Sequence, residues 1–142
     1  MEHTITEILQ EMKVVAVVGC SANPYRTSHH IAKYLKNKGF RMIPVNPEYD
    51  EVLGEKCYDK LADIPREIRI DVVDIFRNPR FTASMVETVI ERMNMTGHAP
   101  VVWTQLGVSS VEAQEKARAA GLRYIEEKCI MVEHRKVSVP GE

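Results

Sequence analysis

The stretch that decides the fold is VVAVVGCSANPYRTS, residues 14–28. Its first five residues are apolar and either β-branched or small, as expected for a strand that is buried on both faces of a parallel sheet. Gly19 ends this run, and a polar loop follows until a helical pattern begins at Thr27. A buried strand, a short loop and a helix in this order indicate an α/β protein.

The same alternation continues along the chain. Further strands are predicted at residues 41–45, 70–76, 100–103 and 122–125, and helices at 4–12 with Thr4 as its cap, 27–38, 81–95 and 109–120, with a short helix or turn at 58–64. Strands that alternate with helices form a parallel sheet with right-handed crossovers. The sequence therefore predicts an α/β fold, a Rossmann-like open parallel five-stranded sheet with helices on both faces.

A proline and two aspartates interrupt the predicted strands. Pro44 lacks the N–H that a central strand needs, so we expect it near the end of its strand. Asp71 and Asp74 are three positions apart in one strand and therefore face opposite sides of the sheet. We expect one of the two to reach water at a strand end.

Size and composition point to one soluble domain. A chain of 142 residues can bury one core, so we expect a single domain over residues 1–137 and a frayed tail at 138–142. With 19 basic and 20 acidic residues the net charge is −1, and no positive field draws the chain onto nucleic acid. No apolar run is long enough to cross a membrane, and the N-terminus lacks the order of a secretory signal, so we expect a cytoplasmic protein.

The cysteines and histidines do not indicate a metal site. Cys20, Cys57 and Cys129 are odd in number and far apart, which argues against both a disulfide framework and a zinc site. We expect Cys129 to be a free buried thiol. His29 and His30 are adjacent on a helix and point roughly 100° apart, so they cannot both bind one metal ion without distortion.

The loop over residues 19–28 has the composition of a phosphate-binding site. Small residues at Gly19, Ser21 and Ala22 let backbone amides approach an anion, and the helix that follows presents its N-terminus. Ser21 can add a hydroxyl and Arg26 a charge. The alternative is a solvated turn whose hydroxyl groups only cap the helix.

Two features favour a ligand other than NAD. The loop lacks the GxGxxG spacing of dinucleotide sites. An NAD site usually has Asp or Glu at the end of the second strand, whereas this chain has Asn46-Pro47 there and Glu48 further on. A carboxylate at that place would repel a ribose that carries a 3′-phosphate, and a neutral asparagine would not.

Four motifs occur in order at the expected strand ends. They are VVGCSANPYRTS at 17–28, PVNP at 44–47, DVVDIFRNP at 71–79 and WTQLG at 103–107. Together they resemble the motif series of the small stand-alone coenzyme A-binding proteins, a family similar in fold to the N-terminal domain of the succinyl-coenzyme A synthetase α subunit. The resemblance runs from about Met12 to Glu133.

This resemblance implies a site for coenzyme A or an acyl-coenzyme A. It places the nucleotide phosphates at the loop 19–28, the adenosine near 46–47 and the next part of the groove at 76–77. The implied residues are Gly19, Cys20, Ser21, Asn23, Pro24, Arg26, Thr27, Ser28, Asn46, Pro47, Phe76, Arg77 and Trp103. Two of them depart from the family pattern, because Cys20 stands where Ala or Gly is frequent and Arg26 where Lys is frequent.

No catalysis by this chain alone is expected. The synthetase depends on a further domain with a phosphorylated histidine and on a second subunit, and we expect neither in 142 residues. Two alternatives stay open: an NAD(P)-binding redox protein or sensor that uses Cys20, and an interaction domain that has lost its ligand. Trp103 can equally be a core aromatic residue. The sequence leaves open whether the chain forms a homodimer.

Overall fold

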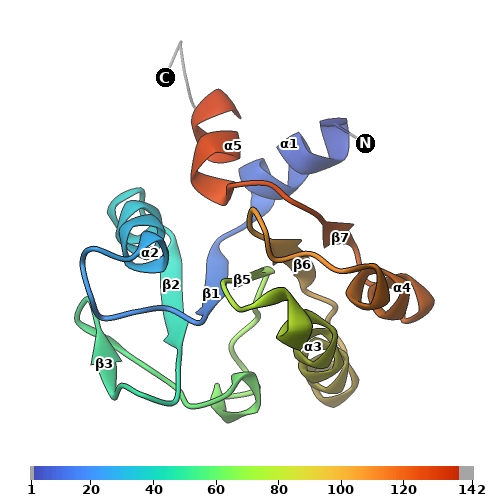
Figure 1. The fold of residues 1–142 in the computed structure, drawn as a ribbon, viewed down its shortest axis with the longest axis horizontal. Helices are drawn as coiled ribbons and strands as arrows, with labels where there is room; N and C mark the ends of the chain where they lie inside the picture. The colour runs from blue at the N-terminus through green and yellow to red at the C-terminus, as the bar shows by residue number, and fades with distance from the viewer. Residues whose placement is uncertain (1, 138–142) are drawn as a thin grey trace.

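A five-stranded parallel sheet forms the centre of the protein, seen in a computed structural model that describes residues 2–137 (Figure 1). Its order is β2-β1-β5-β6-β7. The strands are β1 (Val14–Val18), β2 (Arg41–Val45), β5 (Val72–Ile75), β6 (Val101–Thr104) and β7 (Tyr124–Ile125). This sheet confirms the predicted Rossmann-like α/β architecture.

Helices cover both faces of the sheet, as predicted. One face carries α1 (Glu2–Glu11), α2 (Thr27–Asn37) and α5 (Ile130–Val137), and the other carries α3 (Thr82–Thr96) and α4 (Val111–Ala119) (Figure 1). Among residues 2–137, no helix is both long and apolar enough to cross a membrane.

The strand order reverses between β1 and β5. From β1 the chain runs through α2 to β2 on one side, and it then returns to build β5, β6 and β7 on the other side. In open α/β sheets the ligand binds beside such a reversal, outside the carboxyl ends of the strands. Gly19 and Phe76 follow those ends of β1 and β5.

The apolar run of β1 contributes side chains to two separate hydrophobic cores, one on each face of the sheet. Val15 and Val17 pack under α1, α2 and α5, whereas Ala16 and Val18 pack on the α3 and α4 side. All four side chains are buried, because alternate residues of a strand point to opposite faces and both faces are covered.

Pro44 lies inside β2, one residue before its end, and β2 is an edge strand. Its only neighbour in the sheet is β1, so the missing N–H falls on the outer edge. On that edge Tyr58 donates its N–H to the Pro44 carbonyl at 3.1 Å and accepts from the Asn46 N–H at 2.9 Å.

Several segments differ from the sequence prediction. The chain after β2 forms an antiparallel pair, β3 (Glu51–Val52) and β4 (Glu55–Lys56), whose two-residue strands are too short to show a periodicity. The predicted helix or turn at 58–64 is a 3₁₀ turn at Leu61–Asp63, and another 3₁₀ turn, Pro79–Phe81, precedes α3. The first helix begins at Glu2, so the prediction of Thr4 as its cap is wrong.

Helix α5 was not predicted, because its charged residues 134–136 suggested solvated surface. The structure instead buries His134 against α2, where the Tyr34 hydroxyl lies 2.7 Å from its Nδ1 atom. The predicted frayed tail at 138–142 lies outside the described residues.

Candidate functional site

A cavity of about 620 Å³ opens at the carboxyl edge of the sheet, beside the reversal in strand order. We call it the main cavity. It is lined by residues from the loop after β1, the end of β5, the loop after β6 and the segment before α5: Gly19, Arg26, Thr27, Ser28, Phe76, Arg77, Asn78, Gln105, Leu106, Val108 and Cys129. Six of the residues predicted for the ligand site are therefore brought together in one wall.

Gly19 begins this wall, and its position admits only glycine. Its φ is +85°, and a Cβ atom at this place would lie 2.2 Å from the carbonyl oxygen of Phe76. The Gly19 N–H donates to the Val45 carbonyl at 2.8 Å. The missing side chain thus lets the first loop turn directly against the end of β5.

The loop after Gly19 is fixed by its own polar side chains. The Ser28 hydroxyl accepts from the Ser21 N–H at 3.0 Å, and the Ser21 hydroxyl accepts from the Asn23 N–H at 3.0 Å. The Asn23 side chain in turn accepts from the Tyr25 N–H at 2.9 Å. These bonds set the backbone of the loop before any ligand binds.

The loop leads into α2 without a capping side chain. Arg26 is the residue before the helix, and its side chain makes no capping hydrogen bond. The first N–H groups of a helix have no partner inside it, and the first turn of α2 contains no acidic residue. Because this helix start lines the main cavity beside the exposed Arg26, it can accept an anion. The capping role considered for the hydroxyl groups of Thr27 and Ser28 is not seen.

A second, smaller cavity adjoins the first through Arg77. We call it the side cavity; it measures about 220 Å³ and is lined by Val18, Val45, Pro47, Asp59, Lys60, Leu61, Arg77, Met85 and Thr88. The guanidinium of Arg77 lies 5.3 Å from the ring centre of Phe81. Arg77 lines both cavities, whose other lining residues come from segments between the end of β2 and the loop after β6 and from the segment before α5.

Asn46, predicted to lie by the ligand, holds the loop in place. Its side-chain NH₂ donates to the Cys20 carbonyl at 3.0 Å, and its side-chain oxygen accepts from the Glu48 N–H at 2.9 Å. Asn46 therefore links the first loop to the end of β2. Its neighbour Pro47 lines the side cavity.

Cys20 does not reach either cavity. Its side chain is fully buried, and burial, with smaller contributions from Cys57 and Asp74, raises the pKa of the thiol to about 12. Burial also raises the pKa of Cys57. A thiol that stays protonated at neutral pH is a poor nucleophile, so Cys20 lacks the properties of a reactive cysteine.

Trp103 is fully buried as well, and lines neither cavity. It packs in the core under α1, α2 and α5, and its indole N–H donates to the Lys128 carbonyl at 2.8 Å. Trp103 is therefore a core aromatic residue. It contributes to the site by holding the segment before α5 through this hydrogen bond.

Five residues of the main cavity were absent from the predicted set: Asn78, Gln105, Leu106, Val108 and Cys129. Gln105 and Leu106 belong to the WTQLG motif, so the motif locates this loop correctly, whereas the residue that the resemblance implies within it is Trp103. Cys129 was expected to be a buried thiol, and it is half-buried in the cavity wall. The sequence feature that could have indicated this position is that Cys129 follows the carboxyl end of the last strand.

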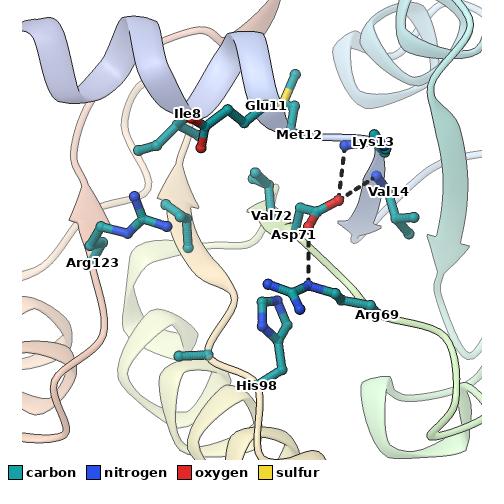
Figure 2. Close-up of a pocket in the computed structure, with 12 residues that line it drawn as sticks. Ile8, Glu11, Met12, Lys13, Val14, Arg69, Asp71, Val72, His98 and Arg123 are labelled. Carbon is teal, nitrogen blue, oxygen red and sulfur yellow. Dashed lines mark hydrogen bonds and ion pairs between the residues drawn. The ribbon is translucent and has the colours of Figure 1, made fainter.

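A third cavity lies at the opposite, amino edge of the sheet (Figure 2). It measures about 420 Å³, and Arg69, His98 and Arg123 are among its lining residues. Asp71 also lines this cavity, and its Oδ2 atom accepts from the backbone N–H groups of Lys13 and Val14 at 2.9 Å each (Figure 2). Asp71 thus joins the start of β1 to the start of β5 and is half-exposed, as expected for one of the two aspartates of this strand.

Comparison with known proteins gives the family. A family described as CoA binding domain matches residues 13–135. The uncharacterized protein YneT of Bacillus subtilis is 39% identical over 130 residues, which cover 92% of this chain and 91% of that protein. A solved structure of a hypothetical protein from Pyrococcus horikoshii OT3 is 41% identical with a TM-score of 0.88, over 96% of this chain and 92% of that one.

The same domain occurs inside larger enzymes. Acetate–CoA ligase (ADP-forming) of Methanocaldococcus jannaschii is 30% identical over 115 residues, which cover 79% of this chain and 16% of the ligase. The match over residues 13–135, together with the parallel sheet and its carboxyl-edge cavity, shows that the chain belongs to the family of CoA-binding domains.

Proposed function

We propose that this chain binds coenzyme A, or an acyl-coenzyme A, in the main cavity. The observation that carries the proposal is the uncapped start of α2, which lines the main cavity together with Gly19 at the strand-order reversal of a CoA-binding domain. The diphosphate of the ligand lies at this helix start. Arg26 and Arg77 then supply positive charge from two separate segments.

The charge of the main cavity supports an anionic ligand. Arg26 and Arg77 line it, and no carboxylate does so among the residues that the structure describes. Nothing in this wall therefore opposes the negative charge of a diphosphate.

We assign the adenosine end of the ligand to the side cavity. Pro47, Leu61 and Met85 offer apolar surface for an adenine ring. Lys60 and Arg77 offer two cations for a ribose 3′-phosphate, against one carboxylate of this lining, Asp59. The neutral Asn46 at the end of β2 adds no repelling charge. A nucleotide can then cross from one cavity to the other past Arg77.

We also propose that binding, without catalysis, is the role of this chain by itself. Within residues 2–137, the lining of the main cavity includes no histidine and no carboxylate, the usual general acids and bases. The matched part of the chain covers only 16% of the Methanocaldococcus jannaschii ligase, so we do not assign the ligase reaction to this chain. The redox alternative at Cys20 is disfavoured by the burial of its thiol.

Calorimetric titration tests the proposed function. Coenzyme A should release heat and saturate one site, dephospho-coenzyme A should bind more weakly because it lacks the 3′-phosphate, and NAD should bind weakest. A preference for NAD, or no heat with coenzyme A, would contradict the proposal. Nucleotide absorbance of the freshly purified protein distinguishes a retained ligand from an interaction domain that has lost it.

A single domain over residues 1–137 and a cytoplasmic location stay predictions. Limited proteolysis should leave one resistant fragment that contains residues 13–135, the range matched by the family. Cell fractionation tests the location.

A further inference from the structure

Cys129 places a thiol in the wall of the main cavity. It is half-buried there, whereas Cys20 and Cys57, the other two cysteines of the chain, are buried and line neither the main nor the side cavity. The function proposed above puts a ligand in this cavity whose own reactive end is a thiol. Two thiols are then contained in one cavity of about 620 Å³.

The cavity beside Cys129 suits the thiol end of the ligand. The positive charges, Arg26 and Arg77, stand with the helix start of α2. The wall from the loop after β6 adds Leu106 and Val108, which are apolar. Val108 belongs to the core on the α3 and α4 side and Cys129 packs against the core under α1, α2 and α5, so the main cavity has an uncharged wall from each face of the sheet. With the phosphates at α2, these are the walls that remain for the uncharged arm of the ligand.

The backbone on both sides of Cys129 is held by the end of β6. The Lys128 N–H donates to the Thr104 carbonyl at 3.2 Å, and the Lys128 carbonyl accepts from the Trp103 indole N–H at 2.8 Å. On the other side the Ile130 N–H donates to the buried Gln105 side chain at 3.0 Å. The thiol is therefore presented from a fixed position, which lowers the entropic cost of bringing two sulfur atoms together.

We propose that Cys129 forms a mixed disulfide with coenzyme A bound in the main cavity. This inference rests on the proposed function. The co-reactant is the symmetrical disulfide of coenzyme A. The Cys129 thiolate attacks one of its sulfur atoms, the bond between the two coenzyme A sulfurs breaks, and a Cys129–coenzyme A disulfide forms. One coenzyme A leaves as thiolate and takes up the proton that Cys129 has lost, so atoms and electrons balance.

Through this disulfide the protein holds coenzyme A covalently under oxidising conditions and releases it when a reductant is added. Thiol–disulfide exchange is reversible, so an added thiol frees both Cys129 and coenzyme A. The site thereby couples the occupancy of the cavity to the redox state of the coenzyme A pool.

Intact-protein mass spectrometry tests the mixed disulfide. The full chain is incubated with coenzyme A disulfide and, separately, with glutathione disulfide, which lacks the nucleotide. We expect one coenzyme A adduct per chain on Cys129, lost on addition of dithiothreitol, and formed at least about tenfold faster than the glutathione adduct because the nucleotide brings the disulfide to the cavity. Cys129→Ser should give no adduct, and Cys57→Ser should react like the wild type.

Two results would overturn the inference. Equal rates with both disulfides would show that Cys129 is an exposed thiol without a directed ligand. No adduct in a protein that binds reduced coenzyme A by calorimetry would show that the ligand thiol lies elsewhere. Failure of reduced coenzyme A to bind is a different result, which refutes the proposed function itself.

Discussion

Gly19 carries the tightest steric constraint in the first loop. A methyl group there meets the Phe76 carbonyl, and the backbone has a positive φ. Gly19→Ala should therefore lower the free energy of unfolding by more than the about 1–3 kcal/mol of a strained backbone alone. It should also weaken coenzyme A binding, because the loop must move away from β5.

Gly39→Ala is the matched control for this change. Gly39 also has a positive φ, of +95°, but a Cβ atom there has nothing within 4 Å. In this variant the free energy of unfolding should fall only by the cost of a positive φ at an alanine, and the affinity for coenzyme A should stay unchanged. Urea denaturation and calorimetry on both variants make the comparison, and equal losses in the two would show that the contact with Phe76 is unimportant.

Arg26 is one of the two arginines that supply positive charge at the proposed phosphate site. It is exposed, lines the main cavity and precedes the uncapped helix. Arg26→Ala should weaken coenzyme A binding by about 1.5–3 kcal/mol, the value of a hydrogen bond to a charged group. Arg123→Ala, at the amino-edge cavity, removes the same charge from the opposite edge and should leave affinity unchanged. Calorimetric titration of both variants decides whether Arg26 faces ligand or solvent.

The loop and helix α2 act together as one element. Ser28, in the first turn of α2, reaches back to the Ser21 N–H, so the helix fixes the loop that leads into it. Ser28→Ala removes this acceptor and should cost about 1 kcal/mol of stability. Affinity for coenzyme A should fall as well, since the amides to which we assign the diphosphate lose their fixed direction.

Ser84→Ala gives the control for this element. Its hydroxyl donates to the Phe81 carbonyl at the start of α3, at 2.9 Å, and it lines neither cavity. Urea denaturation compares the stability of the two variants, and calorimetry compares their affinity for coenzyme A. A Ser28→Ala protein with unchanged affinity would show that the ligand itself can order the loop.

The elements that sequence predicted best are those with a strong local pattern. The continuous apolar run of β1 is recognisable because burial on both faces of the sheet dictates its composition. The pair β3 and β4 was missed because two residues do not make a period. Helix α5 was missed because it has only eight residues, and the charged and polar run at 133–136 interrupts its apolar residues.

The site was predictable only in part, for a related reason. The loop 19–28 carries its own glycine, hydroxyl and arginine chemistry, so it can be recognised without the fold. The wall formed by Val108 and Cys129 depends on how the loop after β6 and the segment before α5 meet, which is a long-range contact. Burial of Cys20 and Trp103 depends on the same packing.

At the scale of the whole molecule, the buried carboxyl group of Asp74 makes the stability of the fold depend on pH. It is fully buried in β5, and neither carboxyl oxygen has a hydrogen-bond partner. Burial raises its pKa well above the ordinary value, so the folded protein retains a proton that the unfolded chain releases. Its contribution to stability is thus fully present below the unfolded pKa of about 3.9 and is lost as the pH rises toward the folded pKa.

Asp74→Asn should remove this pH dependence. Between about pH 5 and pH 8 the wild type should lose stability relative to the variant, by at most about 1.4 kcal/mol for each pH unit. Urea denaturation of both proteins across this range measures the difference. Parallel stability profiles would show that Asp74 does not change its proton between the folded and unfolded states.

The placement of Pro44 has a consequence for assembly. An exposed sheet edge is a template on which another chain can add a strand, and proteins often block it. On the outer edge of β2, Pro44 has no N–H to offer, and its carbonyl and the Asn46 N–H are already bonded to Tyr58. At the far edge, β7 is only two residues long. Both edges of the five-stranded sheet therefore offer little to an added strand, and we expect copies of this chain that associate to do so through helices or loops.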